Sequence, residues 1–259
     1  MRIGVVGYHN SLPLHHGLKD QLPEAELVYE NPSRVAEMLN AEELDVGLVP
    51  VASVATHPDW GVVPGLGIAC RGAVRSVLLL SDKPQTEIHT LVTDPASKTS
   101  NVLAKIWLEA QQPFSIEVKS GSRQWRDRLK AGDATLLIGD EALFLEDPPA
   151  TVIDLGQAWW DWTALPFVFA VWAGPKASDE ALIQGLHRVY EKNQDKLSEL
   201  AHLAEPKDAT RREKVETYLA QSIRYQLGES EEAGLRCYFE RGHHVLDVTP
   251  RGAHHVSVI

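Results

Sequence analysis

Residues 74–80, VRSVLLL, end in four consecutive apolar residues, and residues 167–172, FVFAVW, form a continuous apolar segment; both are of strand length. Apolar runs of this length without alternation are typical of strands buried on both faces. Before the first segment, and again between the two, the sequence alternates strand and helix patterns. Such alternation predicts α/β sheets with many parallel strands. Two separate series of it predict two lobes, and we expect the chain to cross from one lobe to the other at these two segments.

The C-terminal part has a different character. Helical periodicity covers three segments with no clear strand between them, at 180–203, 211–227 and 231–241. We expect this helical block to pack on the first lobe. The sequence therefore predicts an α/β protein with a discontinuous first lobe and an inserted second lobe, namely 1–80 plus 173–259, and 81–172.

The composition is that of a globular chain, with 259 residues, 44% hydrophobic and 24% charged. No apolar run approaches the roughly 18 residues that a membrane-spanning helix needs, so no membrane partner is expected. The net charge of −11 argues against nucleic acid, since phosphate contacts need a basic surface. The first apolar stretch is too short for a secretory signal, which predicts a cytoplasmic location.

Several common site signatures are absent from the sequence. The two cysteines have no metal-ligand spacing, and no phosphate-binding loop, dinucleotide motif or nucleophile elbow occurs. We therefore expect neither a metal nor an organic cofactor. The sequence indicates no oligomeric state.

The first candidate motif is GYHNSLPL, residues 7–14, where the first strand ends and a helix over 11–20 is expected. Free backbone N–H groups at a helix start attract anions, and Asn10 and Ser11 add side-chain donors. The same residues are equally typical of an ordinary helix cap.

The second candidate motif, DPASKTSN at 94–101, repeats this arrangement in the second lobe. Ser97, Thr99 and Ser100 could bind a carboxylate there, although a capped helix start is again the simpler interpretation. Two anion-binding helix starts, one from each lobe, would suit a small dicarboxylate held in the cleft between them.

The third motif is CRGAVRSV, residues 70–77. Arg71 and Arg75 are candidate counter-ions and Ser76 a candidate donor in the cleft, although arginines at strand ends are more often simply exposed.

Two later segments offer acids and aromatic residues. In LLIGDEAL, residues 136–143, Asp140 or Glu141 could act as a base or bind a hydroxyl, but capping the next helix is the favoured role. Trp159, Trp160 and Trp162, which lie close together in the segment 154–172, could line the cleft, although packing is their commoner role.

Five segments together resemble the chorismate dehydratases of menaquinone biosynthesis by the futalosine route. They follow that family's order and spacing: HNSLPL (9–14), GAVRSVLL (72–79), SKTSNVL (97–103), LLIGDEAL (136–143) and DLGQAWWDWTALPFVFAVW (154–172). The resemblance is close up to about residue 175 and looser in the helical remainder. The chain departs from the family pattern at His9, where leucine is usual, and at Ala164, where glycine is common.

The resemblance implies the periplasmic-binding-protein type II fold. It also implies a carbon–oxygen lyase (hydro-lyase) reaction, the loss of water from the dicarboxylate chorismate to give 3-[(1-carboxyvinyl)oxy]benzoate. On this resemblance the enolpyruvyl carboxylate of the substrate takes the proton, and Asn10 and Ser76 are the catalytic residues that hold it in line. The other carboxylate would be bound by Ser97, Thr99 and Ser100.

Ser11, Arg71 and Asp140 complete the predicted substrate-binding residues. Two alternative functions on the same fold stay open, an intracellular solute-binding or sensor protein for a small carboxylate and the sister dihydroxynaphthoate synthase. The sister family typically begins with a Ser-Pro-Cys-Pro-Asn type segment, which this chain lacks.

Overall fold

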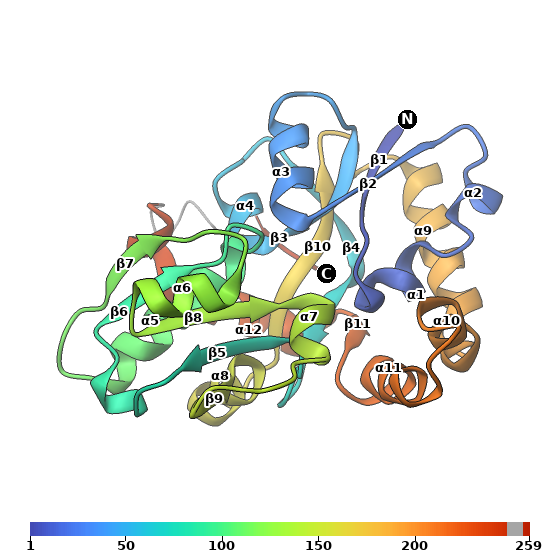
Figure 1. Cartoon of the computed structure of the whole chain (residues 1–259). Coiled ribbons are helices and arrows are strands. Elements are labelled where there is room, and N and C mark those ends of the chain that lie inside the picture. The colour runs from blue at the N-terminus through green and yellow to red at the C-terminus, as the bar shows by residue number, and fades with distance from the viewer. Residues whose placement is uncertain (248–255) are drawn as a thin grey trace.

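Two β-sheets, each with its own helices, organise the chain in the computed structural model (Figure 1). The structure describes residues 1–247 and 256–259. The two sheets lie side by side as separate lobes, with the N-terminal strands in one and the middle of the chain in the other. The predicted two-lobed α/β fold is therefore confirmed.

The first sheet has six strands in the order β11-β4-β10-β3-β1-β2. β1 runs parallel to β2 and β3, whereas β10 is antiparallel to β3 and β4, and β11 is antiparallel to β4. The bounds are β1 (Arg2–Val6), β2 (Glu26–Glu30), β3 (Val46–Pro50), β4 (Gly61–Cys70), β10 (Phe167–Gly174) and β11 (Arg224–Gln226).

The second sheet has five strands in the order β7-β6-β8-β5-β9. β6 is parallel to β7 and β8, and β5 is antiparallel to both of its neighbours. The bounds are β5 (Val77–Ser81), β6 (Thr90–Thr93), β7 (Glu117–Ser120), β8 (Ala134–Ile138) and β9 (Thr151–Asp154).

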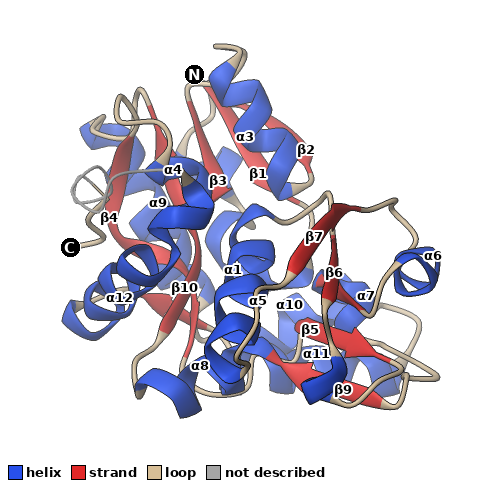
Figure 2. Ribbon diagram, turned by 90° about the vertical axis from the view of Figure 1, so that its left-hand side faces the viewer, coloured by secondary structure: helices blue, strands red, loops and turns tan. Residues whose placement is uncertain are grey.

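Helices flank both sheets (Figure 2). Those up to β10 are η1 (His9–Ser11), α1 (Leu12–His15), α2 (Leu18–Gln21), α3 (Pro32–Asn40), α4 (Val51–Ala55), η2 (Gln85–Glu87), α5 (Lys98–Gln111), α6 (Trp125–Ala131), α7 (Gly139–Leu143) and α8 (Leu155–Thr163). The C-terminal block consists of α9 (Glu180–Asn193), α10 (Leu197–Ala204), α11 (Ala209–Gln221) and α12 (Glu229–Leu246). Across the described residues, no helix combines the length and apolar character that crossing a membrane requires.

β5 and β10, the strands formed by the two apolar segments that indicated the fold, each lie in the lobe opposite to the expected one. The expected division at residues 80 and 172 assigned β5 to the first lobe and β10 to the second, but β5 lies in the second sheet and β10 in the first. A strand buried on both faces has the same apolar sequence in either sheet, so its composition cannot assign it. We propose lobe boundaries at the connectors 71–76 and 164–166.

The helical block also differs in detail from its sequence prediction. The segment predicted as one helix over 180–203 is two, α9 and α10, and the segment 211–227 ends in the short strand β11 rather than continuing as helix. α9 packs on α1 and α2 of the first lobe, while α12 contacts both β10 and α5, and so bridges the lobes. Part of the irregular tail expected over 245–259 lies outside the described residues.

The helix expected over 11–20 is not continuous. η1, α1 and α2 replace it, and Gly17 separates the last two with a left-handed φ of 78°. A helix cannot continue through a residue in that conformation, and glycine adopts it without steric strain.

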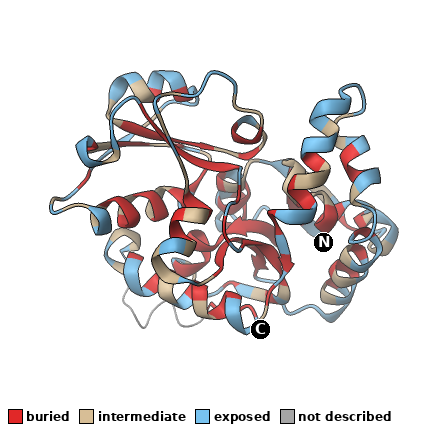
Figure 3. Ribbon diagram, turned by 90° about the horizontal axis from the view of Figure 1, so that it is seen from below, coloured by how far each residue is buried: buried red, intermediate tan, exposed pale blue. Residues whose placement is uncertain are grey.

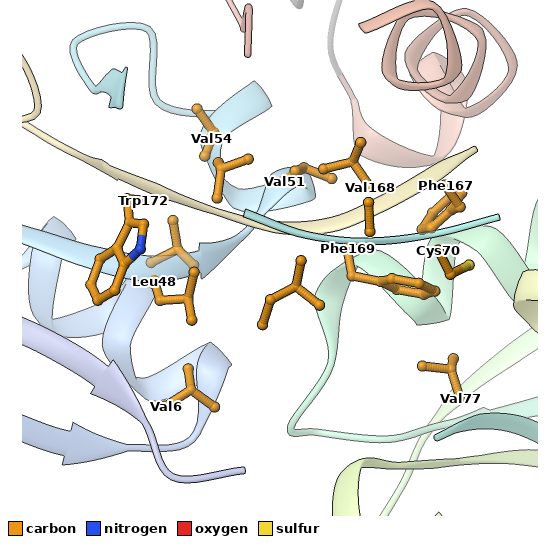
Figure 4. Close-up of a cluster of buried hydrophobic side chains, with 14 of the residues drawn as sticks. Val6, Leu48, Val51, Val54, Cys70, Val77, Phe167, Val168, Phe169 and Trp172 are labelled. Carbon is orange, nitrogen blue, oxygen red and sulfur yellow. The ribbon is translucent and has the colours of Figure 1, made fainter. Parts of the chain in front are cut away.

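Buried residues form most of the inner strands and the inner faces of the helices, whereas the edge strands β2 and β7 contain none (Figure 3). One large apolar cluster includes residues of both sheets. In Figure 4, Leu48 and Phe169 extend to one side of β10, and Val54 and Val168 to the other. One apolar core therefore extends through both lobes.

Candidate active site

A mostly apolar pocket lies between the two lobes, with an empty volume of about 570 Å³. Both lobes contribute walls, and Figure 4 shows Phe169 of the first lobe near Val77 of the second, with Val6 and Leu48 farther from Val77. The lining residues are Val6, Tyr8, Asn10, Pro32, Leu48, Pro50, Ile68, Val74, Ser76, Val77, Ser97, Thr99, Ser100, Ile138, Gly139, Phe169 and Ala170.

Five of the sequence-predicted residues come together in this pocket. Asn10 and Ser76 line it, and so do Ser97, Thr99 and Ser100. The first pair lies in η1 and in the connector after β4, whereas the three hydroxyl residues lie at the start of α5. The pocket therefore has two groups of polar side chains from separate elements within an apolar wall.

Three other predicted residues are placed outside the lining. The Ser11 hydroxyl lies 2.5 Å from the Val6 carbonyl and 2.8 Å from the Tyr8 carbonyl, so it holds the turn that presents Asn10. The Arg71 guanidinium lies over the Trp160 ring at 4.8 Å. Asp140 accepts a hydrogen bond of 3.1 Å from the His9 backbone N–H. In this arrangement each of the three is engaged by the protein itself.

Asn10 has an unmet hydrogen-bonding capacity. Its Oδ1 atom is buried and has no partner among the described residues. A buried amide oxygen without a partner is costly unless a ligand or solvent satisfies it. Since Asn10 lines the pocket, a bound molecule is one way to satisfy it.

Ser76 is held in place through its backbone. Arg75 has a left-handed φ of 64°, which is unfavourable for a residue with a side chain. The Asp154 carboxylate accepts the Arg75 N–H at 2.7 Å and the Val74 N–H at 3.1 Å, while the Gly139 N–H donates to the Ser76 carbonyl at 2.9 Å. The connector is thereby fixed to the second lobe on both sides of Ser76.

Tyr218, a residue that sequence reasoning missed, contacts the Ser76 side chain. The two hydroxyl oxygens are 2.6 Å apart, and both residues are buried. Burial raises the pKa of Tyr218, an effect that hydrogen bonding with Ser76 and Asn10 opposes, so the phenol is neutral at physiological pH. Tyr218 lies in α11, far along the chain from residue 76, and no motif surrounds it.

The start of α5 has the features of an anion site. Ser97 is the N-cap, and its hydroxyl accepts the Ser100 N–H at 3.3 Å. Thr99 donates its hydroxyl to the Phe169 carbonyl of the first lobe at 3.2 Å, which fixes the helix start against β10. The helix continues for 14 residues, so its N-terminal dipole is well developed.

A buried ion pair supports the loop that leads into α5. The Arg128 guanidinium contacts the Asp94 carboxylate at 2.9 Å and the Thr135 hydroxyl at 2.8 Å, and it donates to three backbone carbonyls. Asp94 in turn accepts the Ala96 N–H at 2.8 Å. Burial raises the pKa of the Asp94 carboxyl, although Arg128 acts in the opposite direction.

Tyr8 and Gly139 form a close contact across the lobes. Gly139 has a left-handed φ of 69°, and a Cβ atom there would lie only 2.9 Å from the Tyr8 ring. A side chain at position 139 would therefore push Tyr8 out of the pocket wall. Burial, together with nearby acids, raises the pKa of Tyr8 to about 12.

The pocket has an unusual charge distribution for a site that would take an anion. Along the described lining, no lysine, arginine, histidine, aspartate or glutamate occurs, and Tyr8 is the one titratable side chain. Within residues 1–247 and 256–259, no group of three or more metal-ligating side chains is placed to hold a metal ion.

The three tryptophans do not line the pocket. Trp159 is fully buried and packs against Phe167, and Trp162 lies beneath the Arg241 guanidinium. The packing role is the one that the structure shows for Trp159.

Comparisons with known proteins agree with this arrangement. A chorismate dehydratase of Thermus thermophilus is 30% identical, in an alignment that covers 92% of this chain and 93% of the relative. A chorismate dehydratase of Campylobacter jejuni is 28% identical, covering 91% of this chain and 95% of the relative.

Among solved structures, the periplasmic aliphatic sulphonate binding protein of Escherichia coli superposes with a TM-score of 0.62 at 15% identity, covering 95% of this chain and 93% of the other. At that identity the similarity establishes the periplasmic-binding-protein-like fold. The family model described as menaquinone biosynthesis matches residues 1–244, and the chain therefore belongs to the menaquinone-biosynthesis family.

Proposed function

We propose that this protein dehydrates chorismate to 3-[(1-carboxyvinyl)oxy]benzoate, a hydro-lyase reaction. The observation that carries the proposal is the pocket between the lobes, whose apolar wall suits a six-membered ring and whose polar residues form two groups. Chorismate has a ring and two carboxylates, which match that division. Two relatives of this family at 28–30% identity are chorismate dehydratases.

The two groups of donors would have different roles. Asn10 and Ser76 would hold the enolpyruvyl carboxylate, and the start of α5 would bind the ring carboxylate through Ser97, Thr99 and Ser100. Holding both ends fixes the ring between them. Orientation of this kind can supply a large part of a rate enhancement when the reacting groups belong to one molecule.

The reaction removes a proton and a hydroxyl from neighbouring ring carbons. The C–H bond breaks as its proton passes to the enolpyruvyl carboxylate, the electron pair forms the new ring double bond, and the C–O bond to the hydroxyl breaks. The departing hydroxide and that proton together make water. Because the product ring is aromatic, the overall step is strongly downhill.

The composition of the lining supports a base supplied by the substrate. Tyr8 is the one titratable lining group in the described residues, and its pKa of about 12 makes it a neutral phenol at physiological pH. The part of the lining that the structure describes also offers no cationic side chain, so a carboxylate in this apolar pocket keeps a higher basicity than one paired with arginine.

The place of the enzyme in metabolism follows from the same proposal. We place it in the futalosine route to menaquinone, in agreement with its family. The cytoplasmic location indicated by the N-terminal sequence stays a prediction, which fractionation of the native cell tests.

The direct test mixes the purified protein with chorismate and follows the ultraviolet spectrum, with mass spectrometry to identify the product. We expect conversion to a species lighter by one water. Folded protein that binds chorismate but leaves it intact would contradict the lyase proposal and favour a sensor. Turnover of cyclic futalosine instead would favour the sister dihydroxynaphthoate synthase.

A further inference from the structure

We propose that Tyr218 is a positioning residue that directs the Ser76 hydroxyl proton into the pocket. The inference rests on the proposed function, since it concerns how the reacting carboxylate is held. Tyr218 comes from α11 of the C-terminal helical block, which would thereby take part in catalysis as well as in packing.

The contact is short and enclosed. The Tyr218 and Ser76 hydroxyl oxygens are 2.6 Å apart, and each residue is only 1% exposed. α11 packs against η1, which carries Asn10, so the phenol reaches both residues of the first donor group. Water has little access to compete for this hydrogen bond, and a buried hydrogen bond between hydroxyls fixes the rotamer of the smaller side chain.

The direction of the hydrogen bonds follows from counting protons. A phenol and a serine each carry one hydroxyl proton, and only one of the two lies between the oxygens. Either hydroxyl could donate across this contact, but the Tyr218 hydroxyl has no other hydrogen-bond acceptor among the described residues, whereas Ser76 lines the pocket. Donation from Tyr218 to Ser76 therefore uses both protons, because the Ser76 proton is then left to point at a carboxylate in the pocket.

Two other buried tyrosines distinguish this arrangement from ordinary packing. The Tyr238 hydroxyl donates to the Thr99 backbone carbonyl at 3.2 Å, a contact that anchors a helix turn. The Tyr225 hydroxyl is buried without a partner in the described part of the chain. Of the three, Tyr218 is the one whose hydroxyl meets a side chain of the pocket lining.

The test is Tyr218→Phe, which removes the hydroxyl and keeps the ring. We expect kcat for chorismate to fall about tenfold, as the loss of one buried hydrogen bond implies, while KM changes less than about twofold. Tyr225→Phe is the matched control because it also removes a buried phenol hydroxyl, and it should retain the wild-type kcat. Circular dichroism and the thermal midpoint verify folding of each variant.

The mechanism through Ser76 is tested by a double-mutant cycle. In the Ser76→Ala background, Tyr218→Phe should lower kcat by less than about twofold, because the hydroxyl it would orient is absent. The same tenfold loss in both backgrounds would overturn the inference. A Tyr218→Phe variant with the wild-type kcat would also overturn the inference, while leaving the proposed dehydratase function in place.

A second variant keeps the test available if Tyr218→Phe does not fold. Incorporation of 3-fluorotyrosine at position 218 retains the hydroxyl and makes it a stronger donor. We expect it to change kcat in the wild-type background and not with Ser76→Ala; equal effects in both would overturn the inference. A wild-type protein without dehydratase activity would instead overturn the proposed function and this inference with it.

Discussion

The two sides of the pocket hold their polar residues in different ways. The second lobe presents Ser97, Thr99 and Ser100 at the start of α5, a 14-residue helix, whereas the first lobe presents Asn10 on η1, a single turn of three residues. A long helix offers backbone N–H groups and a dipole to an anion. A single turn does not, so the first lobe must rely on side chains.

The supports behind the two sides differ accordingly. A buried ion pair of Arg128 with Asp94 holds the loop before α5. Asn10 and Ser76 are held by hydroxyl and backbone contacts, together with the Asp154 carboxylate, which accepts backbone N–H groups beside Ser76 and pairs with no cation among the described residues. We infer that the second lobe binds and the first lobe orients. Four substitutions test this division of roles.

The largest effect is expected on the second-lobe side. Arg128→Ala removes the whole side chain that contacts Asp94 and leaves that carboxylate buried without its cation. Breaking a buried pair in this way costs about 4 kcal/mol of unfolding free energy. Denaturant unfolding measures the loss, and Arg126→Ala on the same helix is the control, since that side chain is exposed. Equal stability of the two variants would contradict the structural role.

The next effect concerns pH and the first-lobe side. His15 in α1 is 7% exposed, and burial lowers its pKa to about 4 from 6.5. Between these two pH values, His15 is neutral in the folded protein but protonated in the unfolded chain. The free energy of unfolding therefore falls as the pH drops from about 6.5 to 4. The difference amounts to about 3 kcal/mol.

His15→Phe tests this assignment because it keeps an aromatic ring and removes the titration. Unfolding measured between pH 4 and 7 should show a weaker loss of stability in the variant than in the wild type. Parallel pH profiles would place the acid sensitivity elsewhere.

Asn10→Ala tests the orienting role of the first lobe. We expect kcat to fall about a hundredfold with little change in KM, because the carboxylate stays bound but is no longer held in line. Steady-state kinetics with chorismate measure the two constants. Asn40→Ala is the control, since Asn40 lies outside the pocket and its side chain contacts His57. A loss confined to KM would mean that Asn10 binds rather than orients.

The smallest effect is expected for Ser100→Ala at the start of α5. The backbone N–H groups stay in place, so we expect KM to rise about fivefold and kcat to change little. A kcat loss as large as that of Asn10→Ala would erase the distinction between the two sides of the pocket.

The sequence predicted the parts that depend on local chemistry. β8, the capped start of α5 and the five polar residues of the pocket follow from short patterns that need no knowledge of distant contacts. The break in the helix over 11–20 also had a visible signal, Gly17, which the helical pattern outweighed.

What the sequence did not predict depends on packing between distant segments. β5 and β10 are equally apolar, so only the folded sheets show which lobe each joins. Tyr218 meets Ser76 across 142 positions of sequence, and Asp154 reaches Arg75 across 79, with no pattern that links either pair. Such contacts are set by how α11 and α8 pack rather than by their own residues.

In the proposed mechanism, Asn10 and Ser76 hold the enolpyruvyl carboxylate so that it acts as the base. The most direct measurement compares chorismate with its analogue in which that carboxylate alone is converted to an amide, by following product formation under identical conditions. We predict dehydration of chorismate and none of the amide, with the amide still bound as a competitive inhibitor. Conversion of the amide at a comparable rate would contradict the claim and require a base from the protein.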